Sequence, residues 1–259
     1  MGMKTSRTAR RPGASAAGTV DISRRQGCVF ATLNRPSADN RVSAAMAERL
    51  IKLAEQVEDD DSVRILALTG MGDAFCAGFD AVIDQRLVES MAVLTKPTLA
   101  IVNGDAFDEG LELALAMDLR VAPARARFAL TQLARGVMPH FGGSQRLTRL
   151  IGSAQALKML LTGAPIDGHE AMRLGLITYL ADGRAPLARC AHGIIQSMLK
   201  RGPIAIRLAK EAVLKGFDMT LEQGIRLEED LYALLQTTAD RTEGVRAFLE
   251  KRRPLFKGA

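Results

Sequence analysis

The fold class is decided by three consecutive segments: VFATL at residues 29–33, SAAMAERLIKLAEQVE at 43–58, and ILALT at 65–69. The outer two are short apolar runs and predict buried strands. The middle segment has apolar residues at spacings of 3 and 4: Met46, Leu50, Leu53 and Val57. That period predicts an amphipathic helix. Strand, helix and strand in this order predict a mostly parallel α/β core.

The rest of the chain divides around this core. Thr98 to Val102 predicts another strand, whereas from about Ala185 the pattern is purely helical, with breaks at Gly202-Pro203 and Lys215-Gly216. We therefore expect an α/β core over residues 19–195 and a helical region over residues 196–259, which packs separately or forms an oligomerisation arm. Residues 1–18 are rich in Arg, Ser, Ala and Gly and predict a disordered basic tail, with an organelle presequence as the alternative.

Composition excludes several classes of protein. The 259 residues are 47% hydrophobic and 25% charged, as in soluble globular proteins. No apolar run approaches the roughly 20 residues that span a bilayer. The three cysteines, Cys28, Cys76 and Cys190, lack disulfide or zinc spacing, and there are only three histidines. We expect a cytoplasmic protein with buried thiols, no metal site and no membrane contact.

The charge distribution bears on the partner. The net charge is +6, and the basic residues concentrate near the two ends of the chain. The absence of Trp and the presence of only two Tyr leave few platforms for stacking bases. We therefore expect no nucleic-acid partner, and a basic surface also suits a polyanionic small molecule.

A buried carboxylate is the main candidate for chemistry. Six of the seven residues from Leu111 to Met117 are apolar, and Glu112 is the exception. A buried carboxylate is costly unless it is paired, hydrogen-bonded or protonated. Glu112 could pair with Arg120 or Arg146, or its pKa could be shifted for proton transfer. The helix alone does not decide between these roles.

Two further acids begin the same helix. Asp108 and Glu109 precede Glu112 by four and three residues, spacings that place all three on one face. Mutual repulsion would raise the pKa of one of them. The helix macrodipole also favours acids at this position, which is a purely structural explanation.

Two loops flank this helix in the sequence. Residues 73–80 include the small residues Ala77 and Gly78, which let a ligand approach the backbone, although an ordinary loop is the favoured interpretation of this segment taken alone. Residues 136–147 form a Gly- and Pro-rich loop in which Ser144 is the expected helix N-cap. The N–H groups of such a helix start can bind an oxyanion. His140 lies in this loop and has an exposed, non-functional role as its alternative.

Together these segments resemble the enoyl-CoA hydratase/isomerase, or crotonase, family. The resemblance runs from about Val20 to the C-terminus and rests on the order and spacing of several motifs. They are Thr32 to Pro36, Val63 to Gly70, Ala74 to Asp80, Lys96 to Gly104, Gly143 to Leu147, Leu161 to Gly163, Ala171 to Ile177, and Phe248 to Arg252.

The resemblance implies a spiral of ββα units with a C-terminal helical region that forms trimers, often paired into hexamers. It implies an acyl-CoA thioester as substrate, so that coenzyme A enters with the substrate and no cofactor is tightly bound. The family's shared chemistry is stabilisation of a thioester enolate by two main-chain N–H groups, which by motif position belong to Phe79 and Glu109. The coenzyme-binding positions implied are Ala77, Phe79, Asp80, Ala81, Phe248 and Lys251.

This sequence departs from the family pattern at several positions. Glu112 matches the first of the two hydratase glutamates, but Gln132 replaces the second. Glu109 stands where Gly is usual, which costs strain if that position needs a positive φ. His140 replaces a Gly in the water-binding loop, and residues 80–97 form a shorter lid than usual.

These features define the expected function. We expect an acyl-CoA-processing lyase of the hydratase type with Glu112 as general base, and an isomerase as second choice. A hydrolase, a decarboxylase or a non-catalytic acyl-CoA binder remain alternatives. General acid–base catalysis contributes about 10²–10⁴-fold, and an amide at Gln132 cannot transfer a proton. We hypothesise that His140 supplies the missing proton.

Overall fold

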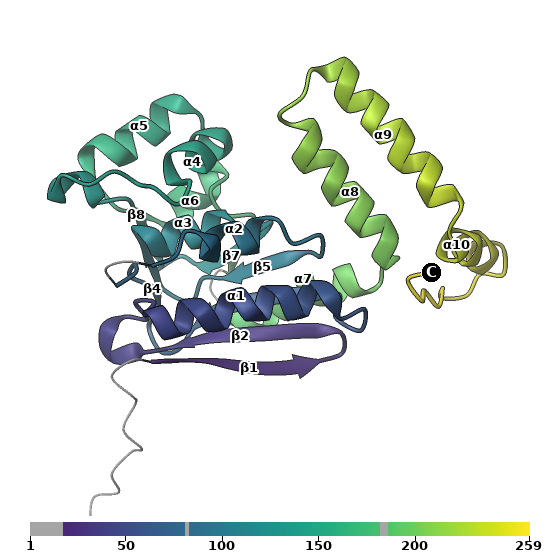
Figure 1. Cartoon of the computed structure of the whole chain (residues 1–259), viewed down its shortest axis with the longest axis horizontal. Helices are drawn as coiled ribbons and strands as arrows, with labels where there is room; N and C mark the ends of the chain where they lie inside the picture. Colours follow the sequence, from purple (N-terminus) through teal and green to yellow (C-terminus); the bar gives the residue numbers. More distant parts are fainter. Residues whose placement is uncertain (1–17, 81–82, 182–185) are drawn as a thin grey trace, which may run out of the picture.

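The computed structural model describes residues 18–80, 83–181 and 186–259. Nearly all of the predicted basic tail, and the predicted coenzyme contact Ala81, lie outside the described residues. The architecture is mixed α/β, as expected, and is built around two sheets (Figure 1).

The first sheet has six strands in the order β1-β2-β3-β5-β7-β10. Their bounds are Thr19–Arg25, Cys28–Asn34, Ile65–Gly70, Thr98–Ile101, Leu119–Pro123 and Tyr179–Ala181. β1 is antiparallel to β2, and the remaining neighbours are parallel. The three strands predicted from their apolar runs are β2, β3 and β5, and their parallel pairing is confirmed.

A second, smaller sheet has the order β4-β6-β8-β9, with bounds Ala74–Cys76, Asp105–Phe107, Arg127–Ala129 and Ile166–Asp167. β3, β5 and β7 are each followed by a strand of this second sheet and then by a helix. The chain therefore spirals through repeated ββα turns. This confirms the fold class that the resemblance implied.

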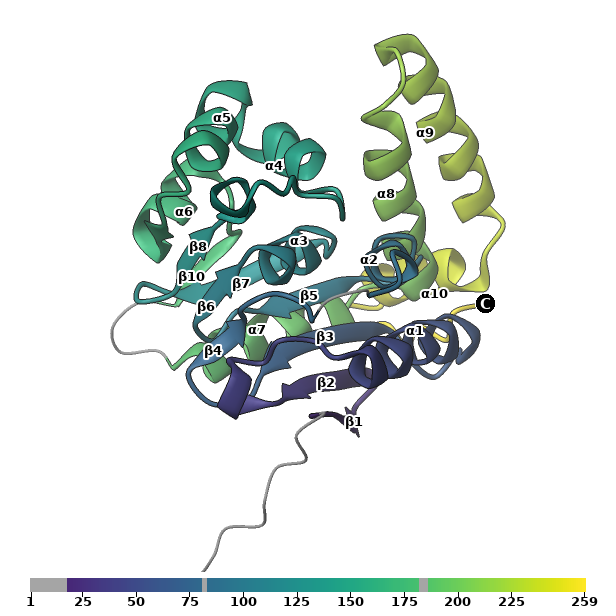
Figure 2. The same ribbon diagram turned by 60° about the vertical axis from the view of Figure 1, so that its left-hand side comes forward.

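Seven helices accompany the two sheets in the described part of the chain. They are α1 Ala44–Asp59, α2 Arg86–Ala92, α3 Glu109–Leu115, α4 Gly143–Ile151, α5 Ser153–Thr162, α6 Gly168–Leu174 and α7 Leu187–Leu199, with the short 3₁₀ turns η1 Pro36–Ala38 and η2 Gln132–Arg135. Helix α1 matches the amphipathic prediction, and its N-cap is Ser43, whose hydroxyl accepts from Met46 N. Figure 2 shows α4, α5 and α6 grouped together, apart from the C-terminal helices.

Both faces of the first sheet are covered, and strand β3 shows how. Ile65 and Ala67 belong to an apolar cluster with Ile194 of α7, whereas Leu66 and Leu68 belong to the larger cluster that contains the buried face of α1. A strand buried on both faces needs apolar residues at every position rather than at alternate ones. The continuous run ILALT is the consequence.

The C-terminal region consists of α8 Pro203–Gly216, α9 Leu221–Gln236 and α10 Ala239–Leu249. Figure 1 shows α8 and α9 as an antiparallel pair standing away from the core. The predicted breaks at Gly202-Pro203 and Gly216 coincide with the two ends of α8. The predicted boundary between residues 195 and 196 falls inside α7, which packs on β7 and β10, so the separate helical region begins at Pro203.

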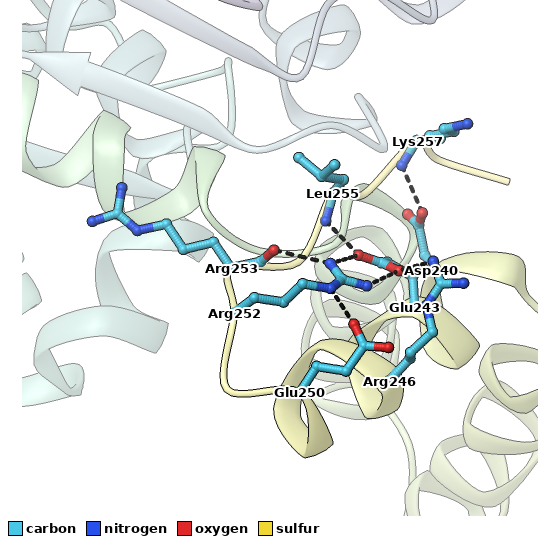
Figure 3. Close-up of polar contacts among 8 residues, drawn as sticks. All are labelled: Asp240, Glu243, Arg246, Glu250, Arg252, Arg253, Leu255 and Lys257. Atoms are coloured by element: carbon cyan, nitrogen blue, oxygen red, sulfur yellow. Dashed lines mark hydrogen bonds and ion pairs between the residues drawn. The ribbon is translucent and has the colours of Figure 1, made fainter.

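Charged contacts tie the last residues of the chain to α10 (Figure 3). The guanidinium of Arg252 donates to Glu243 at 2.6 and 2.9 Å and to Glu250 at 2.5 Å. The Asp240 carboxylate accepts from the main-chain N–H groups of Lys257 and Gly258 at 2.6 and 2.9 Å. The chain end therefore folds back on α10 instead of extending away from it.

Within the described ranges, no helix combines the length and the apolar character needed to cross a bilayer.

A close backbone contact fixes α3 on β4. A Cβ atom added to Gly110 would lie 2.0 Å from the carbonyl oxygen of Cys76. Such a distance is far inside van der Waals contact, so α3 can lie here only with glycine at this position. Gly193, in the middle of α7, is the opposite case, because a Cβ added there meets nothing within 4 Å.

These two glycines give a matched test of the packing. We expect Gly110→Ala to lower the free energy of unfolding by about 1–3 kcal/mol or more, because α3 must move off β4. Gly193→Ala should raise it by about 0.5–1 kcal/mol through helix propensity alone. Urea unfolding followed by circular dichroism measures both. Equal effects of the two substitutions would show that α3 is not held by this contact.

Candidate active site

Glu112 is fully buried in α3, and its carboxylate is held by three donors from outside that helix. Oε1 accepts from the main-chain N–H groups of Phe141 at 2.9 Å and Gly143 at 2.7 Å. Oε2 accepts from the side-chain amide of Gln132 at 3.1 Å. The segment from η2 to the start of α4 is thus attached to α3 through one carboxylate.

The start of α4 explains part of this arrangement. The helix begins at Gly143, after Gly142 with φ of 94°, so the predicted N-cap role of Ser144 is wrong. The first N–H groups of a helix have no intrahelical acceptor, and here Glu112 accepts from one of them across the site. A Cβ on Gly143 would lie 2.8 Å from Glu112 Oε1, so glycine is required for this approach.

The pKa of the Glu112 carboxyl is raised, and the main cause is burial, which disfavours the charged form. The hydrogen bonds from Gly143 and Phe141 oppose this by stabilising the carboxylate. The nearby negative charge of Glu109 raises the pKa further, and His140 lowers it. A carboxylate with a raised pKa is a stronger base once it is ionised, as proton transfer near neutral pH requires.

The structural alternative for Glu112 was an ion pair with Arg120 or Arg146. Arg120 instead donates to the carbonyl oxygens of Met117 at 2.6 Å and Leu176 at 2.7 Å. Arg146 donates to the carbonyl oxygen of Phe141 at 2.7 Å. Among the residues that the structure describes, neither arginine forms an ion pair with Glu112.

Asp108 does not share the environment of the two glutamates, contrary to the prediction from spacing, whereas the predicted repulsion acts between Glu109 and Glu112. Asp108 precedes the helix with φ of 50° and ψ of −123°, so the strained residue is Asp108 and not Glu109. Its carboxylate accepts from the main-chain N–H of Thr131 at 2.5 Å and from Arg135 at 2.9 Å. These contacts hold the turn that aims the two glutamates.

Glu109 turns its carboxylate toward the loop after β4. Its Oε2 accepts from the main-chain N–H of Phe79 at 3.2 Å, and the residue is only 8% exposed. Gly78, with φ of 124°, allows this approach because a Cβ there would lie 2.7 Å from the same oxygen. The N–H group predicted as an oxyanion donor therefore already contacts an anionic oxygen.

Aromatic and basic side chains fix this loop. The rings of Phe79 and Phe141 meet edge-to-face with their centroids 5.1 Å apart. Arg41 donates to the carbonyl oxygens of Ala77, at 3.0 Å, and of Phe79. Asp80 pairs with Arg35 at 2.7 Å. Phe79 of this loop thus contacts Glu109, and the predicted contacts of Ala77, Phe79 and Asp80 with coenzyme A stay predictions.

Comparisons with known proteins identify the family of this chain. The enoyl-CoA hydratase/isomerase family model matches residues 23–259. The chain belongs to the enoyl-CoA hydratase/isomerase family. The (E)-benzylidenesuccinyl-CoA hydratase of Thauera aromatica is 37% identical over 89% of this chain and 95% of its own length. The 2,3-dehydroadipyl-CoA hydratase of Escherichia coli is 36% identical over 92% of this chain and 98% of its own length.

A solved structure extends the agreement to three dimensions. The enoyl-CoA hydratase from Bacillus anthracis superimposes with a TM-score of 0.88 at 35% identity, covering 93% of this chain and 99% of that one. This member of the hydratase/isomerase family therefore shares its fold with a solved hydratase over 93% of its length.

Two residues distinguish the site of this hydratase/isomerase family member. Gln132 is fully buried, and its Oε1 has no hydrogen-bond partner in the described part of the chain. His140 is exposed, with Nδ1 3.4 Å from the carbonyl oxygen of Met138 and its ring 4.2 Å from that of Phe141. The structure thus joins Gln132 to Glu112 and leaves His140 beside the site, and its role as a proton donor stays a prediction.

Phe248 and Lys251 are not brought to this site within one chain. Phe248 lies near the end of α10 and is 82% exposed. In Figure 1, α10 lies beyond α8 and far from α3. Their predicted contact with coenzyme A from a neighbouring subunit stays a prediction.

Arg41 and Phe141 belong to the site although the sequence did not predict them. Arg41 binds the loop through main-chain carbonyls, and Phe141 binds Glu112 through its own N–H group. Main-chain contacts leave no mark in residue type, so no pattern in the sequence identifies these two residues.

The raised pKa of Glu112 has a measurable consequence for stability. The pKa of Glu112 is higher in the folded than in the unfolded state, so ionised Glu112 lowers the free energy of unfolding at neutral pH. As the pH falls through the folded-state pKa toward the unfolded-state pKa, the carboxyl is protonated and this destabilisation disappears. We expect Glu112→Gln to be more stable than wild type at pH 7 and equally stable near pH 4. Urea unfolding at both pH values measures the difference. If the stability advantage of Glu112→Gln over wild type instead grew at acid pH, the pKa of Glu112 would be lowered in the folded state.

Proposed function

We propose that this protein is an enzyme that adds water to an enoyl-CoA thioester, with Glu112 as its general base. The observation that carries the proposal is the Glu112 carboxylate, buried in α3 with a raised pKa and held by three donors. Within the described residues this carboxylate forms no ion pair, so only hydrogen bonds compensate its charge. The names of the hydratase relatives support the same reaction class.

The reaction needs a place for negative charge on the thioester oxygen. We assign this to the N–H groups of Phe79 and Glu109, which come from the loop after β4 and the start of α3. As the first residue of α3, Glu109 has an N–H without an intrahelical acceptor. Fixed N–H donors in a dry site stabilise a developing oxyanion strongly, and removing one such donor typically costs 10²–10³-fold in rate.

A single carboxylate can complete the reaction. Glu112 takes a proton from water while the water oxygen bonds to the β-carbon, and the double-bond electrons move onto the thioester oxygen as the enolate. The enolate then takes the same proton at the α-carbon, which restores the carbonyl and the Glu112 carboxylate. Net addition of water is balanced, and Gln132 needs to transfer no proton.

Gln132 has a positioning role in this scheme. Its amide N–H donates to Glu112, which favours the ionised base. Its Oε1 is buried and unpartnered among the described residues, and a buried acceptor without a donor is costly. A water molecule or a substrate hydroxyl group would supply the missing donor.

Isomerisation of the enoyl double bond is the second candidate. Gln132 favours it, because moving a proton from the α- to the γ-carbon needs one base and the same enolate. Hydration and isomerisation differ in the acyl group that they accept. Coenzyme A enters as part of either substrate.

A trimer, or a hexamer built from two trimers, is the proposed assembly. The helical region carries large exposed apolar side chains, among them Phe217, Leu221 and Tyr232, at 64%, 81% and 62% exposure. Exposed apolar patches of this kind mark interaction sites.

Removal of the base tests the proposed function. We expect Glu112→Gln to lower kcat by about 10²–10⁴-fold on the accepted thioester and to leave the Kd for coenzyme A unchanged. Mass spectrometry on crotonyl-CoA, 3-enoyl-CoA, aromatic, cyclic and carboxylated enoyl-CoA substrates measures turnover. Coenzyme A binding without turnover of any substrate by the wild type would identify a non-catalytic binder instead.

Two substitutions test how the site works without a second carboxylate. If Glu112 works with Gln132 as a positioning group, Gln132→Glu should raise the pKa of Glu112 and move the acid limb of the kcat/KM profile to higher pH. If His140 supplies a proton, His140→Ala should lower kcat by about 10²-fold or more and remove the alkaline limb. An unchanged pH profile in both variants would reject both the positioning role of Gln132 and the proton-donor role of His140.

A further inference from the structure

The Glu109 carboxylate occupies a position that a substrate oxygen needs. Its Oε2 lies 3.2 Å from Phe79 N, within hydrogen-bond distance. Glu109 is buried, with only 8% of its surface exposed. An enolate oxygen and a carboxylate oxygen are both anionic acceptors. One N–H cannot serve both with good geometry, so the two compete.

Packing on both sides holds Glu109 in this place. Gly110, the next residue, lies against the Cys76 carbonyl, and Asp108 before it is fixed by Thr131 and Arg135. The backbone that carries the Glu109 side chain therefore has little freedom to move. With this backbone fixed, rotation of the Glu109 side chain would free Phe79 N.

A cation stands next to the occupied position. A Cβ on Gly78 would lie 2.7 Å from Glu109 Oε2 and 3.1 Å from Arg41 Nη1, so the two groups flank the same glycine. Arg41 is 39% exposed in its side chain and already binds the carbonyl oxygens of this loop. It offers the displaced carboxylate a partner of opposite charge.

We propose that Glu109 is a selectivity residue, whose carboxylate competes with the thioester oxygen for the N–H of Phe79. A neutral thioester carbonyl is a weaker acceptor than a carboxylate. A thioester therefore binds only when contacts of its acyl group and coenzyme outweigh the lost Glu109 contact. The enzyme should accordingly discriminate against small acyl groups. This inference rests on the proposed function, because it uses Phe79 N as the oxyanion donor.

The experiment compares acetyl-CoA, which has a thioester oxygen, with coenzyme A, which has none. Isothermal titration calorimetry gives the Kd of each for wild type and Glu109→Ala. We expect Glu109→Ala to bind acetyl-CoA about tenfold more tightly or better, since a hydrogen bond to a charged group contributes at least that factor. The Kd of coenzyme A should not change.

Matched controls separate the contact from its side effects. Glu109→Gln keeps the length of the side chain and an acceptor oxygen but removes the charge, so it should give a smaller gain than Glu109→Ala. Glu222→Ala removes an exposed acid from the first turn of α9 and should leave both Kd values unchanged. Circular dichroism shows whether each variant is folded. If Glu109→Ala does not fold, Glu109→Gln still tests the inference.

The outcomes are distinct. An equal or weaker affinity of Glu109→Ala for acetyl-CoA would overturn this inference and leave the proposed function standing. An equal gain for acetyl-CoA and coenzyme A would also overturn it, because the effect would not depend on the thioester oxygen. Failure of every variant and of the wild type to bind either molecule would overturn the proposed function as well.

Discussion

The Glu112 charge must be compensated from outside its own helix, because every neighbour within α3 from Leu111 to Leu115 is apolar or small. The donors come from Gln132, Phe141 and Gly143, which belong to a segment at least 20 residues further along the chain. A buried charge without partners would cost several kcal/mol. The same carboxylate thus serves as candidate base and as a link between α3 and the start of α4, so chemistry and local order depend on one residue.

Close backbone packing makes this link possible. Gly110 lets α3 lie on β4, Gly143 lets α4 approach the Glu112 carboxylate, and Gly78 lets the loop after β4 approach Glu109. Each of these glycines removes a Cβ where two elements meet. The spiral of ββα turns supplies the frame, because β4 and β6 are neighbours in the second sheet and their following loops open on the same side. The site is therefore a meeting point of main-chain segments more than of side chains.

Local sequence patterns predicted the parts of the fold that depend on local physics. The strands β2, β3 and β5, helix α1, and the unusual burial of Glu112 all follow from apolar period or from one charge in an apolar run. Predictions that depended on distant contacts were less successful. Ser144 is not a cap, since α4 begins at Gly143 and Glu112 accepts the N–H of that residue. The positive φ belongs to Asp108, because Thr131 and Arg135 hold its carboxylate. No pattern in the sequence encodes these long-range partners.

The contact between Glu109 and Phe79 also bears on how this protein can change through evolution. Every glutamate codon becomes a glycine codon by one base substitution, and glycine is the usual residue of the family at this position. The occupied and the open forms of the site are therefore neighbours in sequence space, with no intermediate to cross. The Gly110 contact with β4 is left intact by such a step. A lineage with this fold can thus pass, by a single point mutation, between a site in which the Phe79 N–H contacts a carboxylate and one in which that N–H is free.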